Sequence, residues 1–298
     1  MKKTFAAVLL IAILAALIYA FRLDALGWYL WHNSSNTEAS AFKLGSYEVE
    51  IDGKRIPGVS DASGLTFHAP SGTLFTVLND EPTVIQLSRQ GEVLRKIRIE
   101  GVSDMEGITH VTRNQFVVVE ESKNRLILFE IGDQDSINIA DAPKLTLGFE
   151  NVRNKSFEGI SWDAKNERIL IVNEKEPKRL VEIRGLLKSS DSTDSNSADI
   201  TIRELWPDKP TFMSALRDLA SLSYDENTGH LLLLSEESRL IKEYDSQGEA
   251  LSAMLLWKGF HGLSKTVPQA EGIAIGPDKK IYIISEPNLF YVFSPARH

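Results

Sequence analysis

The chain has 298 residues, of which 43% are apolar and 25% charged, so it can bury a large core and needs no cross-links to fold. Lys and Arg number 33 against 41 Asp and Glu, and the resulting formal charge of −8 argues against a nucleic-acid partner. Cys is absent, which leaves the redox compartment undecided, because so large a core makes disulfides dispensable in an oxidising space too.

The N-terminus carries a segment that is expected to enter a membrane. Lys2 and Lys3 precede an almost wholly apolar run, Thr4 to Phe21, which approaches the ~20 residues that a bilayer-spanning helix needs. The basic residues in front favour an orientation in which everything after the run is exported, and residues 23–31 add aromatic side chains typical of a membrane interface. We therefore expect a single-pass transmembrane helix within residues 1–31, anchored in the inner membrane, with the remaining chain in the periplasm.

A cleaved signal peptide is the alternative for the same segment. Its apolar core would span about 7 to 15 residues and end at a small-x-small site. Here the run is longer, and the candidate site has the branched Ile18 where a small residue is required. An uncleaved anchor is therefore favoured over secretion to the periplasm after cleavage.

Residues 32–44 are polar, small and without periodicity, and are expected to form a linker. Residues 45–298 are expected to form one all-β domain, because one sequence repeat occurs five times along them. Each copy has a short alternating strand, a turn, a β-branched apolar run, an acidic residue and a third strand. The equivalent apolar positions are Leu65, Ile108, Ile160, Leu222 and Ile273. A period of about 50 residues with three or four strands per copy predicts a β-propeller.

Five copies predict a five-bladed propeller. The last copy ends near Phe293 with no chain left for a fourth strand, so the alternating segment from Ser46 to Ile51 is expected to complete that blade and close the ring. The longest gap follows the third copy and holds a low-complexity stretch, Lys188 to Asp199, which is expected to be loop or disorder. A sixth blade hidden in this gap is the alternative.

Acidic residues recur at two positions of the repeat that propeller topology directs to one mouth of the channel, called here the acidic mouth. The position after the second strand is acidic in every copy: Asp80, Glu121, Glu174, Glu236 and Glu286. The position at the start of the first strand is acidic in three copies, Glu106, Glu158 and Glu271, with Ser63 and Ala220 in the other two. Like charges crowded in a partly desolvated funnel raise one another's pKa values or bind a cation.

These eight carboxylates are the candidate ligands of a divalent cation. Oxygen-only ligands, without Cys or clustered His, favour a hard ion, Ca²⁺ before Mg²⁺, and argue against zinc. The alternative is structural, with each acid hydrogen-bonded to backbone in its own blade and inherited with the repeat. Presence in all five copies favours the structural role for the acids after the second strand, whereas the three glutamates at the start of the first strand fit either interpretation.

Three cations near the same mouth are candidate anion ligands: Lys175, Arg179 and Lys258. Beside metal-binding carboxylates they could hold an anionic substrate, such as a phosphate ester. Solvated loop charge, or pairing with the acids, is the simpler interpretation. A Ser-His-Asp hydrolase is disfavoured because no G-x-S-x-G motif occurs.

The segments around the Glu-Gly pairs resemble a known protein family. Glu106-Gly107-Ile108, the segment from Phe157 to Asp163 and the segment from Pro268 to Ala274 resemble the SdiA-regulated family of bacterial envelope proteins, the YjiK- and CarP-like group, over roughly residues 45–295. The resemblance implies a membrane-tethered periplasmic propeller that binds calcium, with a likeness to phytase propellers, and it does not establish catalysis. Ser63 and Ala220 depart from the Glu-Gly pattern, so a fully symmetric five-fold ion ring is in doubt.

Two functions from different classes remain open. The favoured one is a membrane-anchored periplasmic binding or sensing module that binds Ca²⁺ at the acidic mouth, with a small anionic ligand or an envelope protein as a further partner. The alternative is a metal-dependent hydrolase of phosphate or carboxylic esters that uses the same carboxylates and holds the substrate anion with the three cations.

Overall fold

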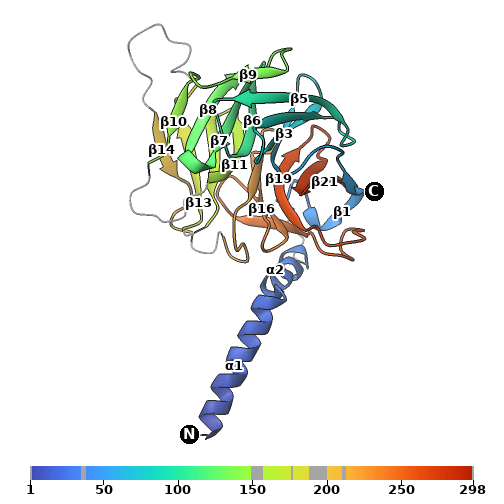
Figure 1. Ribbon diagram of the computed structural model, residues 1–298. Coiled ribbons are helices and arrows are strands. Elements are labelled where there is room, and N and C mark those ends of the chain that lie inside the picture. The colour runs from blue at the N-terminus through green and yellow to red at the C-terminus, as the bar shows by residue number, and fades with distance from the viewer. Residues whose placement is uncertain are drawn as a thin grey trace.

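The computed structural model describes residues 2–34, 38–148, 157–175, 177–187, 200–209 and 213–296. Within them, five β-sheets stand around a ring as the blades of a propeller, and two N-terminal helices project from it (Figure 1). The prediction of a five-bladed all-β propeller is confirmed, and for the described residues the six-bladed alternative is wrong. The stretch Lys188 to Asp199, expected to be loop or disorder, lies outside the described residues.

The strands of blades one to four run from the propeller axis outward in chain order, and blade five takes its outermost strand from the start of the domain. Blade one contains β2 (Ala62–His68), β3 (Thr73–Leu78), β4 (Thr83–Leu87) and β5 (Val93–Glu100). Blade two contains β6 (Met105–Thr112), β7 (Gln115–Glu120), β8 (Arg125–Glu130) and β10 (Lys144–Thr146). Blade three contains β11 (Phe157–Asp163), β12 (Arg168–Asn173), β13 (Arg179–Arg184) and β14 (Thr201–Glu204). Blade four contains β15 (Ser221–Asp225), β16 (His230–Ser235), β17 (Leu240–Tyr244) and β18 (Ala250–Leu255). Blade five contains β19 (Gln269–Ile275), β20 (Ile281–Glu286), β21 (Leu289–Pro295) and β1 (Tyr47–Arg55).

The second strand of each blade is a continuous apolar run. In β16, for example, four leucines in a row, residues 231–234, are all buried. A strand covered on both faces by neighbouring blades has no wet side, so its sequence loses the alternation of a half-exposed strand. This packing explains why the β-branched and Leu-rich runs were the strongest repeat signal in the sequence.

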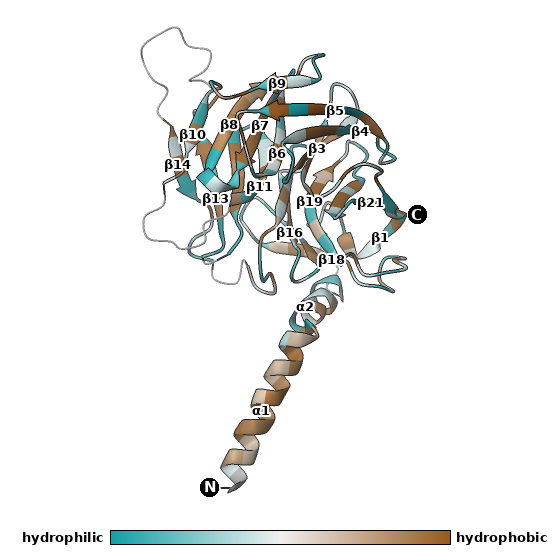
Figure 2. Ribbon diagram, in the orientation of Figure 1, coloured by the Kyte–Doolittle hydropathy of each residue, from teal (hydrophilic) through white to brown (hydrophobic). Residues whose placement is uncertain are grey.

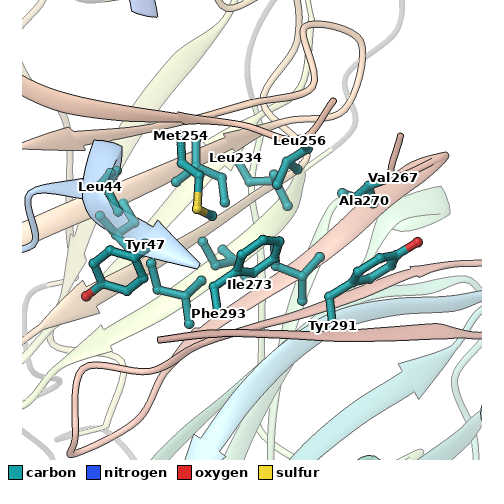
Figure 3. Close-up of a cluster of buried hydrophobic side chains, with 14 of the residues drawn as sticks. Leu44, Tyr47, Leu234, Met254, Leu256, Val267, Ala270, Ile273, Tyr291 and Phe293 are labelled. Carbon is teal, nitrogen blue, oxygen red and sulfur yellow. The ribbon is translucent and has the colours of Figure 1, made fainter. Parts of the chain in front are cut away.

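The ring closes by pairing the two ends of the domain. Strand β1 runs antiparallel to β21, with Tyr47 opposite Pro295 and Arg55 opposite Leu289. Behind this seam, Tyr47 packs with Phe293 in a cluster that spans blades four and five (Figure 3). The predicted closure of the last blade by the N-terminal strand is therefore confirmed, and no edge is left open between the first and last blades.

Three outer strands had no counterpart in the sequence-based prediction. Strands β10 and β14 are the outermost strands of blades two and three, and the short β9 (Ser136–Asn138) adds to the edge of blade one by parallel pairing with β5. All four residues of β14 are exposed. A short exposed strand needs no apolar alternation, so it leaves no periodic signal.

The N-terminal segment forms two helices where one was expected. Helix α1 (Lys2–Ala20) and helix α2 (Leu23–Ser34) meet at a bend of 70°. The break, called here the elbow (Phe21 and Arg22), contains Arg22 in a left-handed conformation with φ of 52°, which a continuous helix does not admit. Among the described residues, neither helix alone has the length and apolar character to span a membrane, but by length and composition the bent pair together could. Helix α1 projects away from the propeller and is apolar along most of its length (Figure 2).

Helix α2 packs against the propeller. Ala25 is fully buried there, and Leu26, Trp28 and Tyr29 contact the core between blades three and four. The aromatic residues at 28 and 29, expected at a membrane interface, therefore cover protein, because an aromatic surface suits a protein groove as well as a lipid headgroup layer. Leu30 and Trp31 remain 56% and 74% exposed.

Much of the expected linker, residues 32–44, is also packed in place. The buried carboxylate of Glu243 on β17 accepts hydrogen bonds from the backbone N–H groups of Ala41 and Phe42 and from the Ser40 hydroxyl. Phe42 and Leu44 are buried in the same cluster as Tyr47. Residues 35–37 lie outside the described residues. The segment is polar and aperiodic in sequence, yet two of its backbone N–H groups are satisfied by one acid from a blade about 200 residues away in the chain.

Candidate functional site

The innermost strands come so close at the axis that glycine is required there. A Cβ on Gly107 would lie 2.1 Å from the carbonyl oxygen of Glu158 in the next blade, and one on Gly272 would lie 2.7 Å from the backbone of Gly64. No side chain fits such gaps. The Glu-Gly pairs thus have a steric explanation for the glycine, and the site question concerns the glutamates.

A β-bulge interrupts the ladder at each of these glutamates. In blade two, Met105 pairs with Glu120 and Gly107 with Val119, which leaves Glu106 unpaired between them. Glu271 is passed over in the same way in blade five, and the register shift of β11 includes Glu158. In blade four, Ala220 at this position precedes β15, whose paired residues show no shift, whereas β2, which carries Ser63, shows a shift between Ser63 and Leu65. An extra residue re-aims its side chain, so the bulges direct three carboxylates toward the axis.

Glu106 is held between two blades. The Asn79 side chain of blade one donates a hydrogen bond to its carboxylate, and Ser63 stabilises the charged form by a further hydrogen bond. Burial outweighs these bonds and, with repulsion from Glu121 and Asp104, raises the pKa of Glu106 to about 7. At neutral pH this carboxyl is therefore only partly ionised.

The other two axial glutamates are perturbed further. Burial raises the pKa of Glu271 to about 8, with added repulsion from Glu286 and Glu236. The pKa of Glu158 lies well above its usual value because of burial and repulsion from Glu174 and Glu271. The charge of Glu106 also repels each of these two carboxylates. The three glutamates therefore interact electrostatically with one another at the acidic mouth.

The acids after the second strand form an outer rim around these three. Burial raises the pKa of Glu236 and of Glu286, and Asp61 and Asp80 add repulsion at Glu286. Asp61 hydrogen-bonds with Asp80 and has a raised pKa as a result. The eight predicted ligands therefore surround a common mouth, as electrostatic neighbours around a ring.

Only part of the predicted set comes within reach of one ion. Among the described residues, one group of carboxylates, Asp104, Glu106 and Glu121, has ligand oxygens within 4.8 Å of one another. All three are partly accessible to solvent and belong to blade two. Three carboxylate oxygens at this spacing, without sulfur or imidazole, fit a hard cation such as Ca²⁺, which takes oxygen ligands and completes its shell with water.

Asp104 was not among the eight candidate ligands selected from the sequence. It lies two positions before the Glu of the Glu-Gly pair, where the bulge brings it beside Glu106. Its left-handed backbone, with φ of 58°, positions its carbonyl oxygen to accept a hydrogen bond from Glu121 N–H at 3.0 Å. The recurrence of Asp at 61, 104 and 218 was the available signal, and the ring geometry was needed to interpret it.

Other acids in these repeats serve the fold. Glu120 is fully buried; burial acts to raise its pKa, but hydrogen bonds from Lys123 and Arg125 outweigh this and hold the pKa below its usual value. Asp218, 2% exposed, accepts hydrogen bonds from the Ser235 hydroxyl and from Glu237 N–H, which fixes the turn after β16. The structural alternative thus describes these two neighbours of the acid positions well.

The three cations expected to hold an anion are arranged unequally. Lys175 Nζ lies 2.6 Å from Glu174 and 2.9 Å from Glu237, and these carboxylates raise its pKa against the effect of burial. Arg179 faces Glu204 on the outer strand of its blade, at 3.5 Å. Lys258 is exposed on the loop before blade five. The structure places one of the three, Lys175, among the acids of the mouth.

His261, in the loop between β18 and β19, is not a surface residue. It is 8% exposed, with Nδ1 2.8 Å from the carbonyl oxygen of Tyr47, and the ring of Tyr29 packs against it. Burial lowers its pKa, so the ring is neutral at physiological pH. His261 contributes to the docking of helix α2.

The comparisons with known proteins agree with this architecture. The family model described as SdiA-regulated matches residues 39–294, which is most of the chain. The chain belongs to the SdiA-regulated family. The match begins before β1 and so includes the packed segment around Phe42, and the suspected family resemblance is confirmed.

Solved structures similar to this SdiA-regulated protein include three enzymes of low sequence identity. A luciferin-regenerating enzyme has a TM-score of 0.50 at 13% identity, covering 83% of this chain and 94% of its own. A streptogramin B lyase has a TM-score of 0.49 at 12% identity, covering 84% of this chain and 98% of its own. A gluconolactonase from Xanthomonas campestris has a TM-score of 0.49 at 13% identity, covering 88% of this chain and 93% of its own. At such identity the likeness concerns the fold, which hosts many unrelated activities.

Proposed function

We propose that this SdiA-regulated protein is a membrane-anchored envelope propeller that binds Ca²⁺ at its acidic mouth and works as a binding or sensing module. The observation that carries the proposal is the group formed by Asp104, Glu106 and Glu121, whose oxygens lie within 4.8 Å of one another. These three residues would hold the ion. The ion would supply the positive charge that the mouth lacks.

The electrostatics of the mouth supports a cation as ligand. Glu106, Glu158 and Glu271 all have raised pKa values because burial and mutual repulsion disfavour their charged forms. A bound cation reverses this effect, since it favours the ionised carboxylates and displaces their protons. Glu158 and Glu271 then contribute as a negative field that attracts the ion without contacting it.

Helix α1 supports a membrane location for the domain. Its apolar side chains are exposed, as at Phe5 (72%) and Leu10 (68%), which is unfavourable in water and favourable in lipid. Basic residues stand at its N-terminal end, which favours the orientation with the propeller outside the cytoplasm. The proposal places the propeller in the periplasm, held against the inner membrane.

Binding has more support than ester hydrolysis on the same carboxylates. A phosphate ester needs uncommitted positive charge beside the metal. Lys175 is held between two carboxylates, and Arg179 is drawn to Glu204 away from the mouth. The charge available to a substrate anion at the mouth is therefore small.

Calcium titration by calorimetry tests the proposal on the full chain in detergent. We expect saturable binding with Kd of about 0.1 to 1 mM, the range of extracellular calcium modules. The variant Glu106→Gln should weaken binding at least about tenfold because it removes a ligand charge. The control is Glu92→Gln on blade one, far from the mouth. The Glu92 side chain is 69% exposed and forms an ion pair with Lys54. No heat of binding, or equal affinity in both variants, would contradict the calcium site.

A further inference from the structure

The elbow between the two helices gathers three arginines from separate parts of the chain. Arg22 lies in the elbow itself and donates a hydrogen bond from Nε to the carbonyl oxygen of Glu237. Arg217, from the segment before β15, donates to the carbonyl oxygen of Tyr19 at 2.7 Å. Arg239 comes from the turn between β16 and β17, which its own N–H closes by bonding to Glu236.

These arginines differ in how their charge is compensated. Arg217 has an ion pair with Asp24 at 3.0 Å and lies 4.1 Å from the centre of the Tyr19 ring. Among the described residues, Arg22 and Arg239 have no carboxylate at ion-pair distance. Nε of Arg239 is buried without a hydrogen-bond partner. An unsatisfied buried guanidinium N–H is rare in a folded protein and calls for a missing acceptor.

The two uncompensated arginines also repel each other. Burial, followed by the charge of Arg22, lowers the pKa of Arg239. Glu236 offsets part of this effect, because its charge raises the pKa of Arg239, while burial and Asp218 raise the pKa of Glu236 itself. An anion placed between the two guanidinium groups would relieve the repulsion and accept a hydrogen bond from the free N–H of Arg239.

In the membrane anchoring proposed above, the bend of the helices would bring this pair of arginines to the membrane surface. If α1 follows the bilayer normal, the 70° bend lays α2 close to the membrane plane. The side of α2 that faces away from the propeller carries Leu23, Leu30 and Trp31. Their side chains are 42%, 56% and 74% exposed, in that order. The elbow then lies at the depth of the headgroups, where apolar and aromatic side chains meet phosphate.

We propose that the elbow binds the headgroup phosphate of an anionic phospholipid, with Arg22 and Arg239 as its ligands. The inference rests on the membrane anchoring proposed above. The guanidinium fork matches a phosphate oxygen pair, and two such groups with no carboxylate at ion-pair distance among the described residues favour a headgroup of net negative charge over a zwitterionic one. Free phosphate shares this chemistry, but the exposed apolar surface of α1 beside the elbow gives a lipid its acyl-chain contact.

Native mass spectrometry of the full chain tests this site. The protein is released from mixed micelles that contain phosphatidylglycerol and phosphatidylcholine in equal amounts, and the retained lipids are counted. We expect phosphatidylglycerol to be retained about tenfold over phosphatidylcholine, and the double variant Arg22→Gln with Arg239→Gln to bring the ratio within about twofold of equality. Arg239→Lys, which keeps the charge and loses the fork, should retain an intermediate preference.

A charge-matched control separates the site from net charge. Lys165 and Lys265 are exposed, and their double change to Gln removes the same charge at other places on the propeller. This control should keep the full preference. Equal retention of the two lipids by the unchanged protein, or an equal loss in the control, overturns the proposal. Displacement of phosphatidylglycerol by inorganic phosphate at comparable concentration overturns the choice of a lipid.

Flotation with vesicles distinguishes a failure of the anchor from a failure of the headgroup site. Protein that floats with phosphatidylcholine vesicles but shows no preference for phosphatidylglycerol retains its proposed anchor and loses the headgroup site. Protein that floats with neither composition overturns both. Calcium binding by the propeller is measured separately and is independent of either result.

Discussion

Two buried glutamates have opposite roles in this propeller, and the difference lies in their partners. Glu120 is buried against Lys123 and Arg125, which stabilise its charge. Glu158 is buried in the next blade among other acids, which destabilise its charge. Sequence columns reveal that an acid recurs but not which neighbours it meets, because those neighbours come from other blades.

This contrast predicts opposite effects of the same substitution on stability. Glu158→Gln should raise the free energy of unfolding by about 1 kcal/mol without calcium, because it removes a repelled charge and keeps the shape. Glu120→Gln should lower the free energy of unfolding by about 3 kcal/mol, because it leaves a buried neutral side chain facing two cations that have lost their carboxylate. Urea unfolding in the presence of a chelator measures both. A loss of stability in the Glu158 variant would show that its charge is compensated.

Stability should also depend on pH in a definite direction. The folded protein keeps protons on Glu106 and Glu271, with pKa values of about 7 and about 8, that an unfolded glutamate with pKa 4.5 has already released. Unfolding therefore releases protons, and the free energy of unfolding falls as pH rises from about 5 to 8.

Thermal unfolding with a chelator across this window measures the effect. We expect the melting temperature to fall by about 5 °C or more between the two ends, and added calcium to reduce the fall because the ion replaces the protons. A melting temperature that is flat or rises over the same window would contradict the perturbed carboxyls.

At the scale of elements, the N-terminal region of this chain is a docked part of the propeller. Strand β1 closes blade five, and the segment before it is fastened to blade four by Glu243. The same carboxylate also accepts from Ser252 and lies 2.7 Å from Nδ1 of His230. One buried acid thus joins the N-terminal segment to two strands of blade four, which orients helix α2 relative to the ring.

Removing this acid should be costly. Glu243→Ala leaves several buried donors without an acceptor and is expected to lower the free energy of unfolding by about 3 to 5 kcal/mol. The control Glu249→Ala, on the same blade, removes a carboxylate that is 67% exposed and paired with Lys209, and should cost less than about 1 kcal/mol. Denaturant unfolding of both variants gives the comparison. Equal costs would mean that Glu243 does not anchor the segment.

For the whole molecule, the repeat, the blade number and the closing strand could be predicted from sequence. Each follows from a pattern that the fold repeats, or from the need to hide sheet edges. The docking of α2 and the bonds of Glu243 could not, because each depends on contacts between segments far apart in the sequence. The bulges at Glu106 and Glu271 could not either, because they are departures from the regular strand pairing that the sequence pattern predicts. The eight candidate positions remain predicted ligands, while the inclusion of Asp104 in the closest group required the geometry of the bulge.

The most direct test of the calcium site is a crystal structure of the calcium-loaded propeller with the ion located by its anomalous scattering. We predict a peak about 2.4 Å from carboxylate oxygens of Asp104, Glu106 and Glu121, completed by water. A calcium-loaded crystal with no peak at this group, or with the ion bound elsewhere on the propeller, would contradict the assignment of the acidic mouth as a metal site.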